Sequence, residues 1–555
     1  MKTMETKDYI VFLCYFIIVA GYGLYIYYKK KSASGDSKDY FLAEGSLTWW
    51  AIGASLIASN ISAEQFIGMS GSGFKIGLAI ATYEWMAAVT LIVVAVFFLP
   101  VYLKNKIFTM PQFLHQRYNG TVAMIMAVFW LLLYIVVNLT SILFLGALAV
   151  SSISGLDFQV CMIGLAVFAI FITLGGMKVI GYTDVIQVFF LILGGLATTY
   201  LALNLVSDHF GGTGVLDGFG IVHEKAQDHF HMILKPDNPN YIDLPGLSVL
   251  IGGMWVINLN YWGCNQYITQ RALGADLPTA RNGLLFAAVL KLLMPLIVVL
   301  PGIAAYVLYN DGLFQQEMIA GGELNPDRAY PVLLNLLPTG LKGLSFAALT
   351  AAVVASLAGK ANSVATIFSL DIYKKIFDKD ATEKKLVNVG KITIVVSMIL
   401  AIFIAPYLGI DKKGGFQYIQ EYTGFVSPGV FAMFLLGFFW KKTTSNAALF
   451  ATIVGFILSI VLKFLPNFMD LSFLAPTGFA IPVDGVYEIP FIDRIGFVFI
   501  FCLIGMYFIS MYENKKGVVT NGLEIDATMF KTKTGFAVGA LLVIGITAAL
   551  YTIFW

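Results

Sequence analysis

Charged residues are scarce in this chain of 555 residues. Only 12% of them are charged and 58% are hydrophobic, whereas soluble domains average roughly 25% charged residues. A chain this apolar is expected to need lipid as its solvent. The formal net charge is only +2, and the basic residues lie in short loops rather than in one patch, which argues against nucleic-acid binding.

Cysteine and histidine are also rare, with four and five residues. Each cysteine lies inside an apolar stretch, and none forms a CxxC pair or a Cys/His cluster, so neither a disulfide framework nor a zinc site is expected. The sequence also has no paired metal-ligand histidines, no nucleophile with its base and no phosphate-cradling glycine loop, so an enzyme is not expected. The first apolar run lacks a small-residue cleavage site, which predicts a retained helix rather than a cleaved signal peptide.

Long apolar runs are abundant, and each has about the 20 residues that a helix needs to cross a bilayer. The sequence therefore predicts an all-α integral membrane protein with about fourteen transmembrane helices. They are expected near residues 8–28, 48–72, 77–103, 121–152, 158–177, 180–206, 246–268, 283–310, 343–373, 386–409, 417–440, 445–465, 491–512 and 535–555.

Basic residues gather in alternate loops between these runs, and loops rich in Lys and Arg face the cytoplasm. The opposite loops are more acidic, above all residues 207–245. This charge bias predicts a multi-pass protein of the inner cell membrane with both termini on the extracytoplasmic side. The basic loops contain Lys30 with Lys31, Lys104, Arg117, Lys178, Arg271, residues 374–391, Lys441 and residues 515–533.

Two of the apolar runs are interrupted by polar clusters, at residues 58–68 and 258–266. A polar cluster inside a span indicates local unwinding toward a cavity, because lipid cannot satisfy backbone polar groups. The clusters lie five helices apart, and broken helices in corresponding halves are typical of the binding site of a transporter built as an inverted repeat. The alternative is that they are ordinary polar contacts between helices.

The inverted repeat predicts five parts of the chain. They are an extra N-terminal helix with a cytoplasmic loop (1–47), a first five-helix repeat (48–206), an extracellular loop (207–245), a second five-helix repeat (246–440) and three C-terminal helices (441–555).

The clearest ionisable residues within predicted spans are Glu84, Lys291 and Lys360, and Asp184 lies near the cytoplasmic end of another span. Each costs at least about 2.5 kcal/mol at a helix centre, so such residues tend to face a pathway. Glu84 stands between Tyr83 and Trp85, a combination suited to the hydroxyls and ring of a sugar. Alternatively, Glu84 bonds a neighbouring helix and Lys291 anchors to backbone carbonyls. The uncharged amides favour a neutral polyhydroxyl ligand over an amino acid; they are Asn60, Gln65, Asn258, Asn260, Gln417 and Gln420.

Several of these motifs resemble the sodium/solute symporter family, and in particular its sodium/galactose branch. They are Asn60-Ile-Ser-Ala-Glu-Gln-Phe-Ile-Gly-Met69, Tyr83-Glu-Trp85, Gln417-Tyr-Ile-Gln-Glu-Tyr-Thr-Gly424, Asn362-Ser363 and Asp371-Ile-Tyr373. The family has a LeuT-type five-helix inverted repeat, in agreement with the pattern of broken helices. The resemblance implies import of a galactose- or glucose-like hexose together with Na+, through alternating access.

The resemblance also implies a sugar site and two gates. Tyr261 would form the inner gate, and Met69, Tyr83 and Phe416 the outer gate. Two positions differ from the sodium/galactose pattern, because Ala87 replaces a serine and Asn260 a tyrosine. The implied substrate-binding residues are Asn60, Gln65, Glu84, Asn258, Tyr261, Lys291 and Gln420.

The implied sodium site consists of oxygen atoms, the ligands that a hard cation prefers. The carbonyls of Ala58, Ile61 and Ala352 and the hydroxyl of Ser356 would supply them, and sodium would leave past Asp184. The family has two adjacent serines here, but this chain has Ala355 before Ser356.

One helical turn after Ser356, Lys360 stands where the family has a methionine. Three interpretations are open: sodium coupling through a site of fewer ligands or one completed by water, transport made sodium-independent or proton-linked by Lys360, or a lysine that merely bonds the backbone. A sugar sensor on the same fold, or a symporter of another polyol such as myo-inositol, would fit these residues too.

Overall fold

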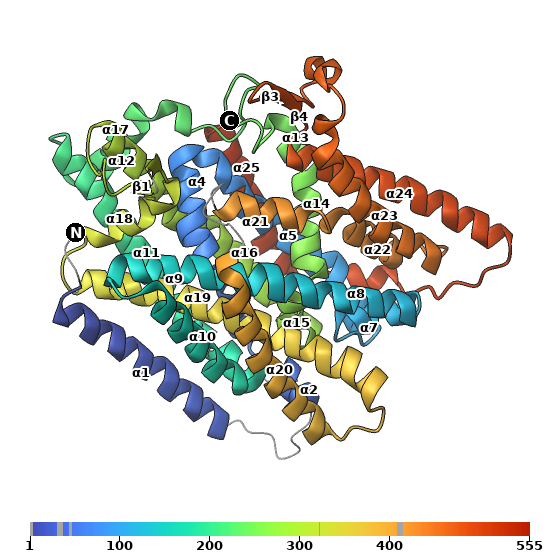
Figure 1. The fold of residues 1–555 in the computed structure, drawn as a ribbon. Helices are drawn as coiled ribbons and strands as arrows, with labels where there is room; N and C mark the ends of the chain where they lie inside the picture. The colour runs from blue at the N-terminus through green and yellow to red at the C-terminus, as the bar shows by residue number, and fades with distance from the viewer. Residues whose placement is uncertain (1–3, 30–36, 44–46, 321, 408–414) are drawn as a thin grey trace. The chain divides into compact units, whose positions relative to one another are not determined.

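The computed structural model describes residues 4–29, 37–43, 47–320, 322–407 and 415–555 (Figure 1). The predicted cytoplasmic charges at Lys30 and Lys31 lie outside the described residues. The chain divides into two compact units, and each consists of three segments that are distant in sequence. Unit 1 comprises Met1–Ala81, Leu131–His231 and Asn282–Ile419, and unit 2 comprises Thr82–Trp130, Met232–Arg281 and Gln420–Trp555.

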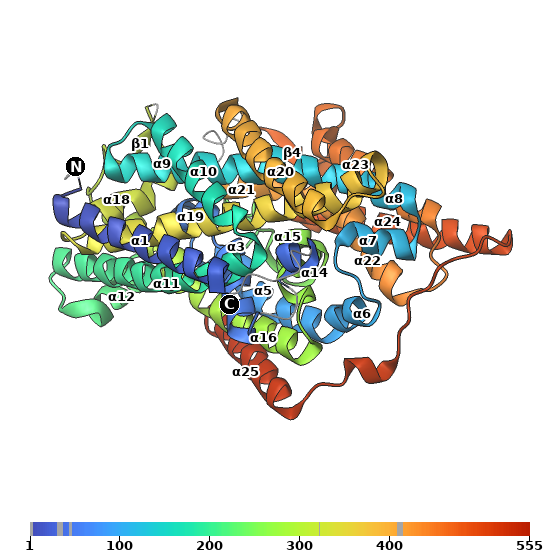
Figure 2. The same cartoon turned by 90° about the horizontal axis from the view of Figure 1, so that it is seen from below.

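Unit 1 is built around the long helices α11 and α19, which pack against each other, and α1 lies along both (Figures 1 and 2). Its α-helices are α1 (Thr6–Lys29), α2 (Ser37–Leu42), α3 (Trp49–Asn60), α4 (Ser70–Lys75), α9 (Thr140–Ser154), α10 (Phe158–Leu174), α11 (Gly176–His209), α12 (Gly214–Lys225), α17 (Leu300–Asn310), α18 (Ala329–Asn335), α19 (Leu341–Thr366) and α20 (Glu383–Ile404). Its π-helices are η1 (Glu64–Met69), η4 (Leu133–Leu139) and η7 (Ile367–Phe377). The smaller elements are the 3-10 turns η2 (Leu78–Ala81), η5 (Gln227–His229), η6 (Pro326–Arg328) and η8 (Ala405–Tyr407), and the hairpin of β1 (Ile319–Ala320) and β2 (Glu323–Leu324).

Unit 2 is centred on α14, which packs against α5, α22 and α24, and α24 also packs against α22. Its α-helices are α5 (Thr82–Val93), α6 (Leu99–Lys104), α7 (Met110–Arg117), α13 (Gly246–Ile251), α14 (Gly253–Cys264), α15 (Gln266–Leu273), α22 (Ser427–Phe439), α23 (Ser445–Phe464), α24 (Phe491–Lys515) and α25 (Thr534–Ile553). The smaller elements are the π-helix η3 (Val94–Phe98), the 3-10 turns η10 (Leu465–Asn467), η11 (Ser472–Thr477) and η12 (Ala527–Phe530), and the hairpin of β3 (Ile481–Val483) and β4 (Val486–Glu488). Helices α8 (Gly120–Leu132), α16 (Leu277–Val298) and α21 (Gly415–Gly424) belong partly to each unit.

Ten helical segments of the described residues are long and apolar enough to cross a membrane. The prediction of a multi-pass, mainly helical protein is therefore confirmed. The other four predicted spans contain shorter helices: the runs near 48–72 and 246–268 are broken, and those near 158–177 and 417–440 have apolar helices of only 17 and 13 residues. The count of fourteen crossings stays a prediction.

The first predicted helix break is confirmed. Helix α3 ends at Asn60, Ile61 is extended with φ −76° and ψ 113°, and the π-helix η1 begins at Glu64. The side chain of Ser62 accepts a hydrogen bond from the backbone N–H of Glu64 at 3.2 Å, as a capping residue does. The chain thus leaves one helix and starts another within three residues.

The second predicted break lies near the end of the polar cluster at residues 258–266. Asn258 and Asn260 are both inside the intact helix α14, and the chain is extended only at Asn265, with φ −96° and ψ 128°. The amide of Asn258 donates to the Met254 carbonyl at 3.2 Å, and that of Asn260 to the Ser427 hydroxyl at 3.2 Å. The two amides therefore find partners without unwinding the helix. A further interruption, at Gly252, separates α13 from α14.

Helix α4, which continues from η1, lies very close to α17. A Cβ atom added at Gly302 would be 2.0 Å from the Ser70 carbonyl oxygen, and one at Gly73 would be 2.6 Å from that of Val299. Backbones approach this closely only where glycine faces the neighbour. The glycines thus let α17 support the helix that follows the first break.

Candidate functional site

Unit 1 contains a polar cluster at the C-terminal end of α3. The Ser59 carbonyl accepts hydrogen bonds from the Ser356 hydroxyl at 3.0 Å and from the Lys360 ammonium at 3.5 Å. The ammonium also donates to the Ser356 hydroxyl at 2.9 Å. Both side chains come from the middle of α19 and are at most 2% exposed. Helix α19 therefore meets the end of α3 with a hydroxyl and a positive charge.

A second ammonium reaches the same end of α3, because Lys291 of α16 donates to the side-chain oxygen of Asn60. Two buried carboxylates also belong to this region: Asp184 contacts α3, and Glu64 lies in η1 just after the break. Asp184 accepts a hydrogen bond from Ser55 of α3 at 2.5 Å, and Glu64 of η1 accepts one from Ser141 at 2.9 Å.

The broken helix of unit 1 is thus associated with two lysines and two acids. Lys291, Lys360, Asp184 and Glu64 are all buried, and Glu64 interacts electrostatically with Lys360. Buried charges persist when opposite charges and hydrogen-bonding groups compensate them. The formal charges of the four groups sum to zero.

The residues predicted to bind sodium all lie in unit 1 and are buried: Ala58, Ile61, Ala352 and Ser356. Ala355, which is also buried, presents only a methyl group where a second hydroxyl was expected. The oxygens at the end of α3 suit a cation, because the last carbonyls of a helix carry its partial negative charge. Coordination of sodium by the four predicted residues stays a prediction.

Gln65 and Met69 follow the break within η1, and Phe416, the other outer-gate residue of unit 1, lies on α21. The Gln65 amide oxygen accepts from the Ser62 backbone N–H at 2.9 Å, which fixes the side chain at the start of η1. Met69 is the last residue of η1 and Phe416 is the second residue of α21, and both are buried. A Cβ added at Gly68 would be 2.8 Å from the Phe416 backbone nitrogen, so α21 and η1 are in close contact.

Unit 2 holds the other predicted sugar-site residues. Tyr83 and Glu84 are buried in the first turn of α5. Asn258 is buried in α14, and the ring of Tyr261, one turn later, lies edge-on to those of Trp262 and Tyr267, with centroids 5.1 and 5.7 Å away. Gln420, on α21, is half-buried.

Sequence reasoning missed Glu64, Ser141 and Ser55. Glu64 lies inside the polar cluster that marked the first break, and its charge within a predicted span was a sufficient signal. Ser141 and Ser55 gave no such signal, because a serine in an apolar helix usually bonds to its own backbone. Their role follows only from their contacts with Glu64 and Asp184.

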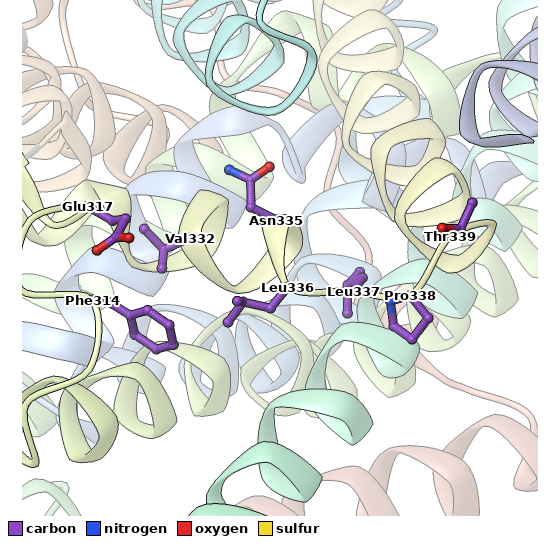
Figure 3. A pocket seen from close by; sticks show the side chains of 8 residues that line it. All are labelled: Phe314, Glu317, Val332, Asn335, Leu336, Leu337, Pro338 and Thr339. Atoms are coloured by element: carbon purple, nitrogen blue, oxygen red, sulfur yellow. The ribbon is translucent and has the colours of Figure 1, made fainter. Parts of the chain in front are cut away.

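A separate cavity of about 620 Å³ lies in unit 1, where the segment between α17 and α19 folds back on itself (Figure 3). Its lining is largely apolar, with Glu317, Asn335 and Thr339 as polar exceptions. None of its lining residues was predicted to bind sugar or sodium; they are Phe314, Glu317, Val332, Asn335, Leu336, Leu337, Pro338 and Thr339.

Comparison with known proteins yields one matching family description. Residues 40–455 match the "Sodium:solute symporter family". Over 99% of its length the chain is 47% identical to the sodium/glucose cotransporter of Vibrio parahaemolyticus, of which 98% is covered. It is 33% identical to the human sodium/myo-inositol cotransporter 2 over 83% of this chain and 70% of that protein.

A solved structure shows the same fold. The substrate-bound, outward-open structure of a Na+-coupled sialic acid symporter superimposes with a TM-score of 0.75, covering 92% of this chain and 98% of that one. At 21% identity this likeness concerns the fold alone, which is that of LeuT-type transporters.

Proposed function

Because the chain belongs to the sodium:solute symporter family, we propose that it imports a glucose- or galactose-like hexose together with sodium. The observation that carries the proposal is the 47% identity, over nearly the whole of both chains, to a sodium/glucose cotransporter. Membership of this family confirms that the coupling ion is sodium and that the protein is a transporter rather than an enzyme.

The buried polar groups support a neutral, hydroxyl-rich substrate. Gln65, Asn60 and Lys291 in unit 1, and Glu84 and Asn258 in unit 2, supply donors and acceptors from within otherwise apolar helices. Hydroxyl groups can both donate to and accept from such a set. The sequence motifs assign sugar binding to these residues, with Tyr261 stacking on the sugar ring and Gln420 as a further amide.

The proposed mechanism is alternating access. Sodium binds first, at the carbonyls of Ala58, Ile61 and Ala352 and the hydroxyl of Ser356, and favours the outward-open arrangement. Sugar then completes the site, and the outer gate formed by Met69, Tyr83 and Phe416 closes over it.

The rocking of one helix bundle against the other opens the inner side. Sodium leaves past Asp184, and sugar follows past Tyr261. The free energy comes from the ion gradient and the membrane potential, and no covalent bond changes.

The proposed topology has fourteen crossings with a five-helix inverted repeat, residues 48–206 against residues 246–440. Supporting it are the two broken helices, with interruptions at residues 61–63 and at Asn265, which lie five predicted spans apart. Both termini face outward across the inner cell membrane, with residues 207–245 outside and the last three helices following residue 440.

Uptake of radiolabelled galactose into proteoliposomes tests the proposal. We expect accumulation in an inward sodium gradient and none when choline replaces sodium. Gln65→Ala and Glu84→Ala should each lower uptake at least about tenfold, because each leaves sugar hydroxyls without a partner. The exposed Gln159→Ala and Glu488→Ala serve as matched controls.

Normal uptake by both site variants would show that the proposed sugar site is wrong. Equal accumulation with and without a sodium gradient would contradict symport. Because the human relative at 33% identity is named for myo-inositol, that polyol belongs in the same assay. Preferential uptake of myo-inositol over galactose would show that the substrate is this polyol rather than a hexose.

A further inference from the structure

The end of α3 attracts positive charge for a reason that does not depend on sodium. Carbonyls in the last turn of a helix have no N–H partner within the helix and carry its partial negative charge. The Ser59 carbonyl belongs to this turn, because α3 ends at Asn60. It accepts hydrogen bonds from the Ser356 hydroxyl and the Lys360 ammonium instead.

The ammonium of Lys360 thus makes contacts that a sodium ion would also make. It lies 2.9 Å from the Ser356 hydroxyl oxygen and 3.5 Å from the Ser59 carbonyl oxygen. Ser356 is the hydroxyl assigned to sodium, and Ser59 stands between the assigned carbonyls of Ala58 and Ile61. Two positive charges a few ångströms apart in a buried site repel each other strongly.

We propose that Lys360 is a built-in competitor of sodium, which occupies the oxygens at the end of α3 in the absence of the ion and must leave them before sodium binds. The inference rests on the proposed sodium symport and adds a step to it. Sodium binding becomes an exchange of one cation for another at the same oxygens. Sodium coupling is retained, but at a lower affinity for sodium than the oxygens alone would give.

Glu64 gives the displaced ammonium a destination. Its carboxylate lies on η1, just after the break, is buried and interacts electrostatically with Lys360. Ser141 holds it with a hydrogen bond of 2.9 Å. The lysine side chain is long and flexible, so the ammonium can turn from the Ser59 carbonyl toward the carboxylate while its backbone stays in α19.

The other two charged groups of the cluster also make hydrogen bonds, since Lys291 donates to Asn60 and Asp184 accepts from Ser55. Glu64 is the acid for which an electrostatic interaction with Lys360 is found.

Equilibrium binding of radioactive sodium to the purified protein, without sugar, tests the exchange directly. Lys360→Met removes the competing charge and keeps a side chain of similar length. It should tighten sodium binding by about tenfold or more, because removal of a nearby like charge favours the ion strongly. Lys342→Met is the matched control, since Lys342 is a buried lysine of the same helix near its N-terminus, and it should leave sodium affinity unchanged.

A double-mutant cycle with Glu64→Gln tests whether the displaced Lys360 ammonium moves to the Glu64 carboxylate. The substitution should weaken sodium binding when Lys360 is present and have a smaller effect in the Lys360→Met background. Chromatographic monodispersity and thermal stability of each variant establish that it is folded.

An unchanged or weakened sodium affinity in folded Lys360→Met overturns the exchange, and so does an equal effect of Glu64→Gln in both backgrounds. Sugar uptake separates this failure from that of the proposed function. If the unaltered protein accumulates sugar in a sodium gradient, symport holds whatever the binding data show. If it does not, symport itself is wrong.

Discussion

His229 is a half-buried histidine in η5, within the predicted extracellular loop at residues 207–245. Its ring stacks on Tyr306 with centroids 3.9 Å apart, and its Nε2 lies 3.1 Å from the Phe74 carbonyl oxygen. Burial lowers the pKa of His229 below its usual value of 6.5, although the Phe74 carbonyl and Asp228 favour the charged ring. The neutral form is thus the one that fits the folded state.

Protonation of His229 should therefore lower the stability of the folded protein in acid. The unfolded chain takes up a proton as the pH drops through about 6.5, whereas the folded chain does so only at lower pH. Free energy of unfolding is consequently lost between these two pKa values and retained above them. Thermal melts of the purified protein from about pH 8 to about pH 5 measure it.

His229→Phe keeps a ring against Tyr306 and should flatten this part of the pH profile. His115→Phe, at an exposed position of α7, is the control and should leave the profile unchanged. A profile that His229→Phe does not alter would show that another group governs the acid sensitivity.

At this scale, the sequence predicts which charged side chains are buried better than it predicts their partners. Lys291 and Lys360 stand out because a charged side chain in an apolar run is costly and is therefore usually functional. The electrostatic interaction of Glu64 with Lys360 could not be predicted, because nearly three hundred residues separate them along the chain.

At the scale of elements, α4 depends on the absence of side chains at its contact with α17. A methyl group at Gly302 would be 2.0 Å from the Ser70 carbonyl oxygen, a distance that no side chain adopts without a shift of backbone. Since α4 continues from η1, such a shift would also displace Gln65 and Met69. The close contact therefore links helix packing to the broken helix.

Gly302→Ala should destabilise the protein by about 1–3 kcal/mol or more, as overpacking of a close contact does, and should lower sugar affinity as well. Thermal melts and equilibrium sugar binding measure the two effects. Gly164→Ala, at a position of α10 with no atom within 4 Å of the added Cβ, should be neutral or slightly stabilising. Equal melting of Gly302→Ala and Gly164→Ala would mean that the helices separate without cost.

The two helix breaks show what can be predicted about an element and what cannot. The first is marked by a Ser-Asn-Ile-Ser run that offers caps to both ends, and it lies where expected. The second lies at Asn265, near the end of its polar cluster, because the amide nitrogens of Asn258 and Asn260 find partners in Met254 and Ser427 within intact helix. A polar cluster therefore indicates that a helix breaks nearby, whereas the partners of each amide decide where.

At the scale of the whole molecule, the charge bias of the loops sets the orientation in the membrane. Cysteine labelling can test it, because of the four cysteines only Cys14 is exposed. In a Cys14→Ser background, an impermeant maleimide added to intact cells should label Lys235→Cys, on the acidic loop. It should not label Asn521→Cys, on the basic segment between α24 and α25, until the cells are opened; both positions are exposed.

Labelling of Asn521→Cys, but not Lys235→Cys, in intact cells would reverse the proposed orientation. Labelling of both would contradict the proposed odd number of crossings between them.

The balanced charges around the broken helix have an electrical consequence. Lys291, Lys360, Asp184 and Glu64 sum to zero and stay attached to the chain, so they return to their starting positions in every cycle. Each sodium ion that crosses with a neutral sugar then moves one uncompensated positive charge across the membrane. A potential of 100 mV does about 2.3 kcal/mol of work on it, enough to concentrate sugar about fiftyfold with no difference in sodium concentration.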